Sequence, residues 1–301
     1  MKFSTILTLG TIAVVLALVS LWMGQQAYSW LPPQAAAESK LVDDLFSFLV
    51  MLGTFIFLGV TGTLLYSVLF HRASKYDYTD GPAIEGSVTL EVVWTAIPIF
   101  LVFWIASYSY QVYEQMAVRG PMDVVHFHVP MTDEAVYADV ADVKPIEDIE
   151  VHAKQWAWSF HYPGTNITSS ELHLPVDRRI RLSMQTEDVI HGFYVPAFRL
   201  KQDIVPNRTI EFEFTPVREG RYRLNDSQFS GTYFAVMEAD VIVQSLDAYK
   251  QWLAEAAVSP SVPAYNRAFA EYTRRTERAI KSDWATIPPA PPPLVRDVSG
   301  E

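Results

Sequence analysis

The architecture is decided by two uncharged stretches, LFSFLVMLGTFIFLGVTGTLLYSVLF at residues 45–70 and VVWTAIPIFLVFWIASYSYQVY at residues 92–113. As α-helices rising about 1.5 Å per residue, they would be about 39 Å and about 33 Å long. The hydrocarbon core of a bilayer is about 30 Å thick. Pro98 falls in the early turns of the second stretch, where a membrane helix tolerates it. The sequence therefore predicts a transmembrane helical hairpin within residues 38–113.

The orientation of this hairpin follows from its basic residues. The loop between the two spans, residues 71–90, carries Arg72 and Lys75 close to the first span, whereas Lys40 is the only positive charge on that span's opposite flank. Loops rich in Lys and Arg stay on the cytoplasmic side of a membrane. We therefore expect the 71–90 loop in the cytoplasm and residues 114–301 outside.

The N-terminal segment, residues 1–37, allows two interpretations. An apolar run at residues 4–23 follows Lys2 and precedes three small residues at 35–37. This order is found in signal peptides, where small residues mark the cleavage site. The run is also long enough for an uncleaved third span. The sequence leaves both alternatives open.

The outer part changes pattern. Residues 114–244 contain short runs of alternating apolar and polar residues broken by Pro, Gly, Asn and Asp, which predicts an all-β sandwich or barrel. Residues 245–301 form a tail with a helix capped by Ser245 and a second helical candidate at 264–284. The proline-rich residues 287–295 are not expected to pack as a domain of their own.

Composition narrows the chemistry. The 301 residues include no cysteine, and their mean hydropathy is +0.11. The lack of cysteine excludes disulfides, thiolate zinc sites, iron–sulfur clusters and copper centres with a thiolate ligand. The formal net charge is −11, which argues against a nucleic-acid partner. Most of this negative charge lies in residues 114–243. These acidic residues could form an ordinary solvated face or a docking surface for a basic partner.

Three motifs in this order resemble subunit II of the haem-copper terminal oxidases. They are TDGPAIEGSVTLEVVWTAIP at 79–98, QWAWSFHYP at 155–163 and DVIHGFYVPAFRLKQDIVPNR at 188–208. The resemblance runs from about residue 41 to residue 253, and the first motif looks most like cyanobacterial members. It implies a membrane-anchored protein in which a two-span hairpin precedes a cupredoxin-like β barrel.

The resemblance also implies a copper site that has been lost. In copper-bearing members the binuclear copper-A centre uses the histidine of the third motif and a run of the form C-x-E-x-C-x3-H-x2-M. Here that histidine is His191, and the run aligns with Asp226, Gln228, Ser230, Phe234 and Met237. Both thiolates are missing, and a binuclear copper centre depends on such soft, anionic ligands. We expect no metal and no cofactor in this subunit, with haem and copper in the partner subunit I.

The second motif contains Trp156 and Trp158, which by resemblance are candidates for the aromatic side chains through which electrons enter copper-bearing relatives. Without a copper acceptor we expect them to be core or interface aromatics instead. No residue of this chain is expected to be catalytic.

The function implied is that of a non-catalytic subunit II in a proton-motive oxidase that reduces O2 to water. Copper-less members of the family are quinol oxidases, so a membrane quinol, plastoquinol in cyanobacteria, is the expected donor. The partners implied are oxidase subunits I and III and the lipid bilayer. The location implied is the bacterial cytoplasmic membrane or the thylakoid, with the β domain on the periplasmic or lumenal side.

Two alternatives remain open. One is a cytochrome c oxidase subunit in which cytochrome c donates directly to subunit I. The other is a stand-alone membrane-anchored cupredoxin-like binding protein.

Overall fold

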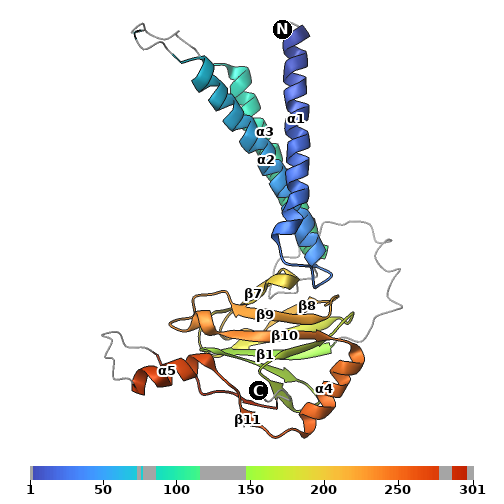
Figure 1. Ribbon diagram of the computed structural model, residues 1–301, viewed down its shortest axis with the longest axis vertical. Helices are drawn as coiled ribbons and strands as arrows, with labels where there is room; N and C mark the ends of the chain where they lie inside the picture. Colours follow the sequence, from blue (N-terminus) through green and yellow to red (C-terminus); the bar gives the residue numbers. More distant parts are fainter. Residues whose placement is uncertain (1–2, 73–75, 77–85, 116–146, 278–286, 297–301) are drawn as a thin grey trace. The chain divides into compact units, whose positions relative to one another are not determined.

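The structure, a computed structural model, describes residues 3–72, 76, 86–115, 147–277 and 287–296. The chain forms two compact units (Figure 1). The helical unit contains residues 1–31 and 41–115, and the β unit contains residues 32–40 and 116–301. The sequence-based division placed a domain boundary after residue 37. In the structure, the short connector of residues 32–40 is grouped with the β unit.

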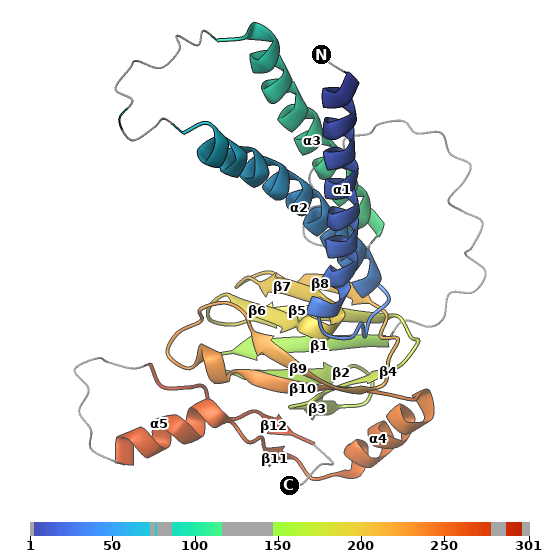
Figure 2. The ribbon, with the colours of Figure 1, turned by 45° about the horizontal axis from the view of Figure 1, so that its top comes forward.

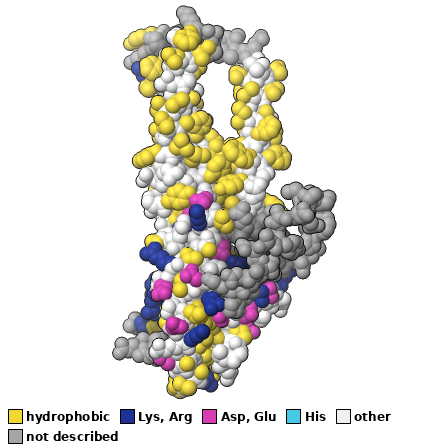
Figure 3. Space-filling model, turned by 90° about the vertical axis from the view of Figure 1, so that its right-hand side faces the viewer, with side chains coloured by type: hydrophobic (Ala, Val, Ile, Leu, Met, Phe, Trp, Pro, Cys, Tyr) yellow, Lys and Arg dark blue, Asp and Glu magenta, His cyan; other side chains and the backbone are white. Residues whose placement is uncertain are grey.

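The helical unit consists of long apolar helices. These are α1 (Phe3–Ala27), extended by the short 3-10 helix η1 (Tyr28–Trp30), α2 (Ser39–Phe70) and α3 (Val88–Gln115). Each is long and apolar enough to cross a membrane, as the hairpin prediction requires. Phe48 of α2 packs edge-on against Trp104 and Tyr108 of α3, both at 5.4 Å between ring centroids. Figure 3 shows hydrophobic side chains covering the outside of these helices, as expected of helices in lipid.

The β unit is a sandwich of two five-stranded sheets (Figure 2). The first sheet has the order β3 (Ile167–Ser169), β2 (Ala157–Tyr162), β1 (Glu147–Lys154), β5 (Ile180–Thr186) and β8 (Ile210–Phe214). The second has the order β4 (Leu172–Pro175), β10 (Glu238–Gln244), β9 (Gly220–Asp226), β6 (His191–Val195) and β7 (Leu200–Ile204). The all-β, cupredoxin-like prediction for the outer part is confirmed.

Alternation explains how this sandwich closes. Along β1, Ile149, Val151 and Ala153 are buried while the residues between them are partly exposed. The pattern has period two, so every second side chain enters the space between the sheets. Phe160 of β2 and Phe193 of β6 are fully buried in the same core. β1 pairs parallel with β5, and β10 parallel with β4, whereas the other strand pairs within these two sheets are antiparallel.

The C-terminal tail begins with α4 (Leu246–Val258), whose N-cap is Ser245 as predicted. It continues with β11 (Val262–Pro263), α5 (Arg267–Glu277) and β12 (Leu294–Val295), and β11 pairs with β12. The proline-rich residues were not expected to pack as a domain, and in the structure they pack against the sandwich. The Ala290 amide donates to the Gln155 carbonyl at 2.6 Å, and Val295 is buried.

Some sequence predictions fall outside the described residues. These are most of the 71–90 loop, the start of the outer domain up to residue 146, and the end of the second helical candidate, residues 278–284.

Candidate functional site

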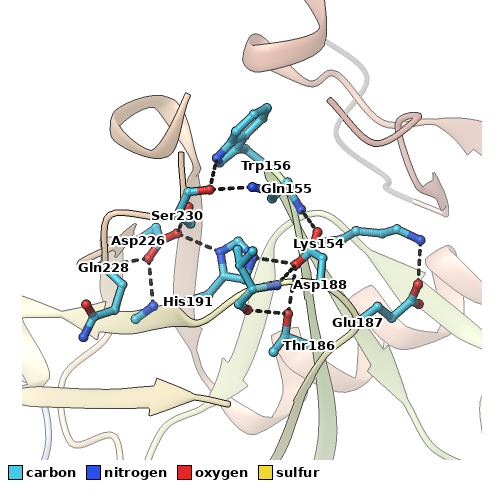
Figure 4. A network of polar contacts seen from close by, with 12 residues as sticks. Lys154, Gln155, Trp156, Thr186, Glu187, Asp188, His191, Asp226, Gln228 and Ser230 are labelled. Atoms are coloured by element: carbon cyan, nitrogen blue, oxygen red, sulfur yellow. Dashed lines mark hydrogen bonds and ion pairs between the residues drawn. The ribbon is translucent and has the colours of Figure 1, made fainter. Parts of the chain in front are cut away.

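The positions that align with copper ligands lie at one end of the second sheet. His191 opens β6, Asp226 closes β9, and the pairing of these two neighbouring strands brings the two side chains together. The segment after β9 turns back through Ser230 toward the short 3-10 helix η4 (Phe234–Val236). Figure 4 shows His191, Asp226 and Ser230 joined in one polar network.

Asp226 is the centre of this network. Its Oδ1 accepts from the amides of Gly192 at 2.7 Å and Gln228 at 3.0 Å, and its Oδ2 accepts from Ser230 Oγ at 2.7 Å. The same Oδ2 lies 2.8 Å from His191 Nδ1, and the side chain is completely buried. Burial alone would raise the pKa of the Asp226 carboxyl, but the hydrogen bonds from His191, the two amides and Ser230 outweigh it and lower that pKa. Asp226 is therefore a buried carboxylate.

His191 lies between two carboxylates. Its Nδ1 faces Asp226, its Nε2 lies 3.1 Å from Asp188 Oδ1, and its side chain has no exposed surface. A neutral imidazole has one N–H and could satisfy only one of these acceptors, whereas an imidazolium donates to both. Burial would lower the pKa of His191, yet hydrogen bonds to Asp188 and Asp226 outweigh it and raise that pKa. The geometry therefore favours a protonated His191.

Asp188 connects the network to the surface, because about a quarter of its side chain is exposed. Burial raises the pKa of its carboxyl, but His191 and the amides of Gln155 and Val189, both at 2.7 Å, lower it to about 2. Asp188 was not among the residues selected from the sequence. The signal was available, since it lies three residues before His191 in the same motif.

The other copper-ligand positions have separate surroundings. The Gln228 side chain donates to Asp203 Oδ2 at 2.8 Å, and the Phe234 ring packs against Phe229 at 5.0 Å between centroids. Met237 is buried in the core, and its carbonyl accepts from the Asp226 amide at 3.1 Å. The six aligned positions thus form a polar trio and three side chains with other partners.

This donor set does not fit a binuclear copper centre. No thiolate is present, and both ring nitrogens of His191, the one histidine among the six aligned positions, lie within hydrogen-bond distance of carboxylates. Within the described part of the chain, no group of three or more His, Asp or Glu side chains has the arrangement of a metal site. The network places the His191 imidazole between two carboxylates, which favours a proton on His191, at the positions that align with the copper ligands.

The two tryptophans of the second motif pack beside this network. Trp156 and Trp158 are 2% and 3% exposed, and they do not face solvent as side chains open to a soluble donor would. Trp156 Nε1 donates to the Ser230 carbonyl at 3.2 Å, and Trp158 Nε1 donates to the Met237 carbonyl at 3.3 Å. Both rings therefore hold the segment that would carry the copper ligands.

The C-terminal tail covers the backbone at this corner. Asn266 Nδ2 donates to the Trp156 carbonyl at 3.0 Å, beside the Ala290 contact with Gln155. A cleft of about 800 Å³ lies here, lined by both tryptophans, by tail residues and by three arginines: Trp156, Trp158, Ala264, Tyr265, Asn266, Arg267, Pro293, Arg221 and Arg223 among others. No sequence pattern pointed to Asn266, because its partner is 110 residues away.

Comparison with known proteins gives the family. Residues 20–112 match the transmembrane domain of cytochrome c oxidase subunit II, and residues 165–246 match its periplasmic domain. Cytochrome c oxidase subunit 2 of Synechocystis sp. is 36% identical over 275 residues, covering 83% of this chain and 82% of its own length.

Two further relatives are more distant. Quinol oxidase subunit 2 of Bacillus spizizenii is 25% identical over 228 residues, covering 73% of this chain and 63% of its own length. The crystal structure of the periplasmic domain of subunit II of cytochrome oxidase from Bradyrhizobium japonicum covers 36% of this chain and 91% of its own. Its sequence identity is 27% and its TM-score 0.35. The chain belongs to the subunit II family of the haem-copper terminal oxidases.

Proposed function

We propose that this chain is the copper-less, non-catalytic subunit II of a quinol oxidase. Family membership makes it part of an oxidoreductase complex, a membrane protein with an extracellular-side domain that associates with other oxidase subunits. The proposal adds that the subunit carries no electrons. The observation that carries it is the network of Asp188, His191 and Asp226 at the aligned copper position.

This network has no redox-active group. Carboxylates, an imidazolium and a hydroxyl bind protons, and none of them accepts one electron from a cytochrome at moderate potential. Fast one-electron transfer in this family depends on the soft thiolates of a copper centre. A donor that reaches subunit I through the membrane does not need this subunit as a relay, and a quinol is such a donor.

The buried tryptophans support the same proposal. Trp156 and Trp158 were the candidates for electron entry from a soluble cytochrome, but both are almost fully buried and the tail contacts the backbone of Trp156. The name of the Bacillus spizizenii relative also shows that quinol oxidases occur among the proteins similar to this chain.

The complex proposed here reduces O2 to water and conserves energy as a proton gradient. Haem and copper reside in subunit I, and subunit III is a further partner. We place the complex in the bacterial cytoplasmic membrane or the thylakoid, with the β unit on the periplasmic or lumenal side. In this assembly the subunit acts as a scaffold. Its membrane helices pack against subunit I, and its outer domain lies on the periplasmic or lumenal side of the bilayer.

A second candidate is a cytochrome c oxidase in which cytochrome c donates directly to subunit I. The acidic surplus of residues 114–243 favours it, because basic cytochromes dock on acidic surfaces. A stand-alone cupredoxin-like protein is no longer proposed, since the family consists of subunits of a complex.

The deciding experiment is oxygen uptake by the purified complex with quinol or with reduced cytochrome c. We expect uptake with quinol and none above background with cytochrome c, together with no copper in the separated subunit II. Uptake with cytochrome c that falls steeply with ionic strength would favour the second candidate. Stoichiometric copper in this subunit would contradict the proposal.

A further inference from the structure

The connector of residues 32–40 is part of the fold of the β unit. The Ala35 amide donates to the Ala197 carbonyl at 3.0 Å, and the Ala35 carbonyl accepts from the Val217 amide at 2.9 Å. Two residues later, the Ala37 amide donates to the Thr215 carbonyl at 2.9 Å. The connector thus satisfies backbone groups on both sides of its path, as a strand does. We call residues 32–40 the strap.

The strap is buried where it crosses the sandwich. Ala35 has no exposed surface and Ala36 is 2% exposed, and Ala36 forms a β-bridge with Pro216. Both belong to the same hydrophobic core as the two sheets. A gap at these positions would open the core to water at the end of β8, so the small residues fill a place that the fold requires.

Ion pairs hold the C-terminal part of the strap, at Glu38, against the sandwich. Glu38 Oε1 pairs with Arg179 Nη1 at 2.8 Å, and its Oε2 accepts from the Thr215 amide at 3.1 Å. Arg179 also pairs with Glu213 at 3.3 Å, and both carboxylate side chains are less than a tenth exposed. Buried charges persist in folded proteins only with such partners. Arg179 therefore joins Glu38 of the strap to Glu213 of β8.

Helix α1 is equally well fitted within the helical unit. Ser47 Oγ of α2 donates to the Gly24 carbonyl of α1 at 2.8 Å. A side chain at Gly24 would meet Met51 Cβ at 3.0 Å and the Ser47 carbonyl at 3.1 Å. Ser20 and Ala27, one turn on either side of Gly24, are buried as well. Close approach at small residues with a hydrogen bond is how membrane helices pack against each other.

We propose that this chain retains α1 as a third membrane span and that the strap is a permanent element of its outer domain. Cleavage after the small residues 35–37 would remove Ala35, Ala36 and their backbone partners. Cleavage before residue 32 would remove Gly24 from its contact with Ser47. Both segments that a signal peptidase would discard are built into the unit to which they belong. Because the strap lies in the outer domain, α1 runs outward from a cytoplasmic N-terminal end.

The first test is the start of the purified protein. Mass spectrometry of the intact subunit, with proteolytic peptides quantified against peptides of the β unit, should find residues 3–31 in equal amount. A protein that begins anywhere between residues 22 and 41 would overturn the proposal.

The second test uses a matched pair of glycines in α1. A side chain at Gly10 would meet nothing within 4 Å, whereas one at Gly24 would meet α2. We expect Gly24→Val to lower the amount of assembled oxidase in the membrane several-fold and Gly10→Val to leave it unchanged. If α1 is removed during export, both variants yield the same mature protein, and equal assembly would overturn the proposal.

The third test is orientation, which is clean because the chain has no cysteine. Ser4→Cys should react with an impermeant thiol reagent only in inside-out vesicles, and Lys201→Cys on the exposed surface of β7 should react in intact spheroplasts. A Ser4→Cys protein that reacts in spheroplasts, or that has lost residue 4, would overturn the proposed topology.

Discussion

The sandwich core and the polar network at its edge are both buried, but different forces hold them. In the core, Phe160 and Phe193 are stabilised by removal from water, which depends on volume and tolerates a change of chemistry at similar size. In the network, His191 and Asp226 are stabilised by particular partners, and any loss leaves a buried polar group unsatisfied. A core side chain can therefore be exchanged for another of similar volume, whereas a change at one member of the network affects its partners as well.

Charge balance explains the residues found here. A copper centre would bring cations to the end of β6 and β9, and thiolates would balance them. In this chain the geometry favours a protonated His191 as the positive charge, with Asp188 and Asp226 as the negative charges. Ser230 donates to the Asp226 oxygen that His191 also contacts. Asp188, His191, Asp226 and Ser230 are linked by hydrogen bonds, so we expect a substitution at one of them to weaken the contacts of the others.

The largest effect should come from the core. Phe193→Ala removes a ring with no exposed surface, and we expect the outer domain to lose about 3–5 kcal/mol of unfolding free energy. The matched control is Phe229→Ala, because Phe229 is 79% exposed and should change stability by about 0.5 kcal/mol or less. Thermal unfolding of the detergent-purified protein measures both. Equal losses would mean that Phe193 is not in the core.

The sequence predicted those features that depend on local pattern. The spans within α2 and α3 follow from apolar length, and the strands β1, β2, β5 and β8 follow from alternation. β6 was quoted only as part of a loop motif, because HGFYV has no period-two pattern and both of its faces are buried. Buried strands give no alternation to detect.

The site was predictable in its positions but not in its partners. The spacing of the aligned motif identified His191, Asp226 and Ser230, which the structure joins. It did not identify Asp188 as the second carboxylate or Asn266 as a cover of the tryptophans. The sequence indicated only a possible cleavage site in the strap, because PPQAAAE has no strand signal. Its pairing with Ala197 and Val217 spans more than 150 residues, and such contacts are invisible to local periodicity.

The second prediction concerns the network. Asp226→Asn keeps the shape of the side chain but removes the anion beside His191, and we expect a loss of about 1–3 kcal/mol. The matched control is Asp148→Asn, since Asp148 is half exposed with a single pair to Arg181 at 3.3 Å. An exposed pair of this kind contributes about 0–1 kcal/mol. If both variants lose the same unfolding free energy, the buried network contributes no more to stability than an exposed ion pair.

The third prediction is a pH dependence that the core does not share. The folded-state pKa of His191 is raised, so its stabilising contribution is complete below its unfolded pKa and is lost as pH rises through the folded pKa. The folded-state pKa values of Asp188 and Asp226 are lowered, so their contribution is present above their unfolded pKa and is lost as pH falls through the folded values. We expect greatest stability between these limits, in mildly acidic solution.

The effect of pH should be smaller than that of Asp226→Asn, because deprotonated His191 still donates one hydrogen bond and the amides still contact Asp226. The control is His191→Gln, which should flatten the decline at high pH, while the decline at low pH becomes smaller but persists because backbone amides still lower the pKa values of both carboxyls. Midpoints of thermal unfolding at a series of pH values measure it. A decline above neutral pH that persists in His191→Gln would assign the effect to another group.

The smallest effect should come from the tail. Asn266 donates to the Trp156 carbonyl and accepts from the Phe269 amide at 2.8 Å, so it covers the tryptophan corner and caps α5. Loss of a cap by Asn→Ala costs about 1 kcal/mol. The matched control is Glu271→Gln, which alters only an exposed pair with Arg267 at 3.6 Å and should be neutral. If the tail protects the tryptophans, oxidation of Trp156 by a small water-soluble reagent, followed by peptide mass analysis, should be faster in Asn266→Ala than in Glu271→Gln. Oxidation at equal rates would mean that the sandwich alone buries Trp156. The tail would then have no part in keeping a soluble electron donor away from this tryptophan.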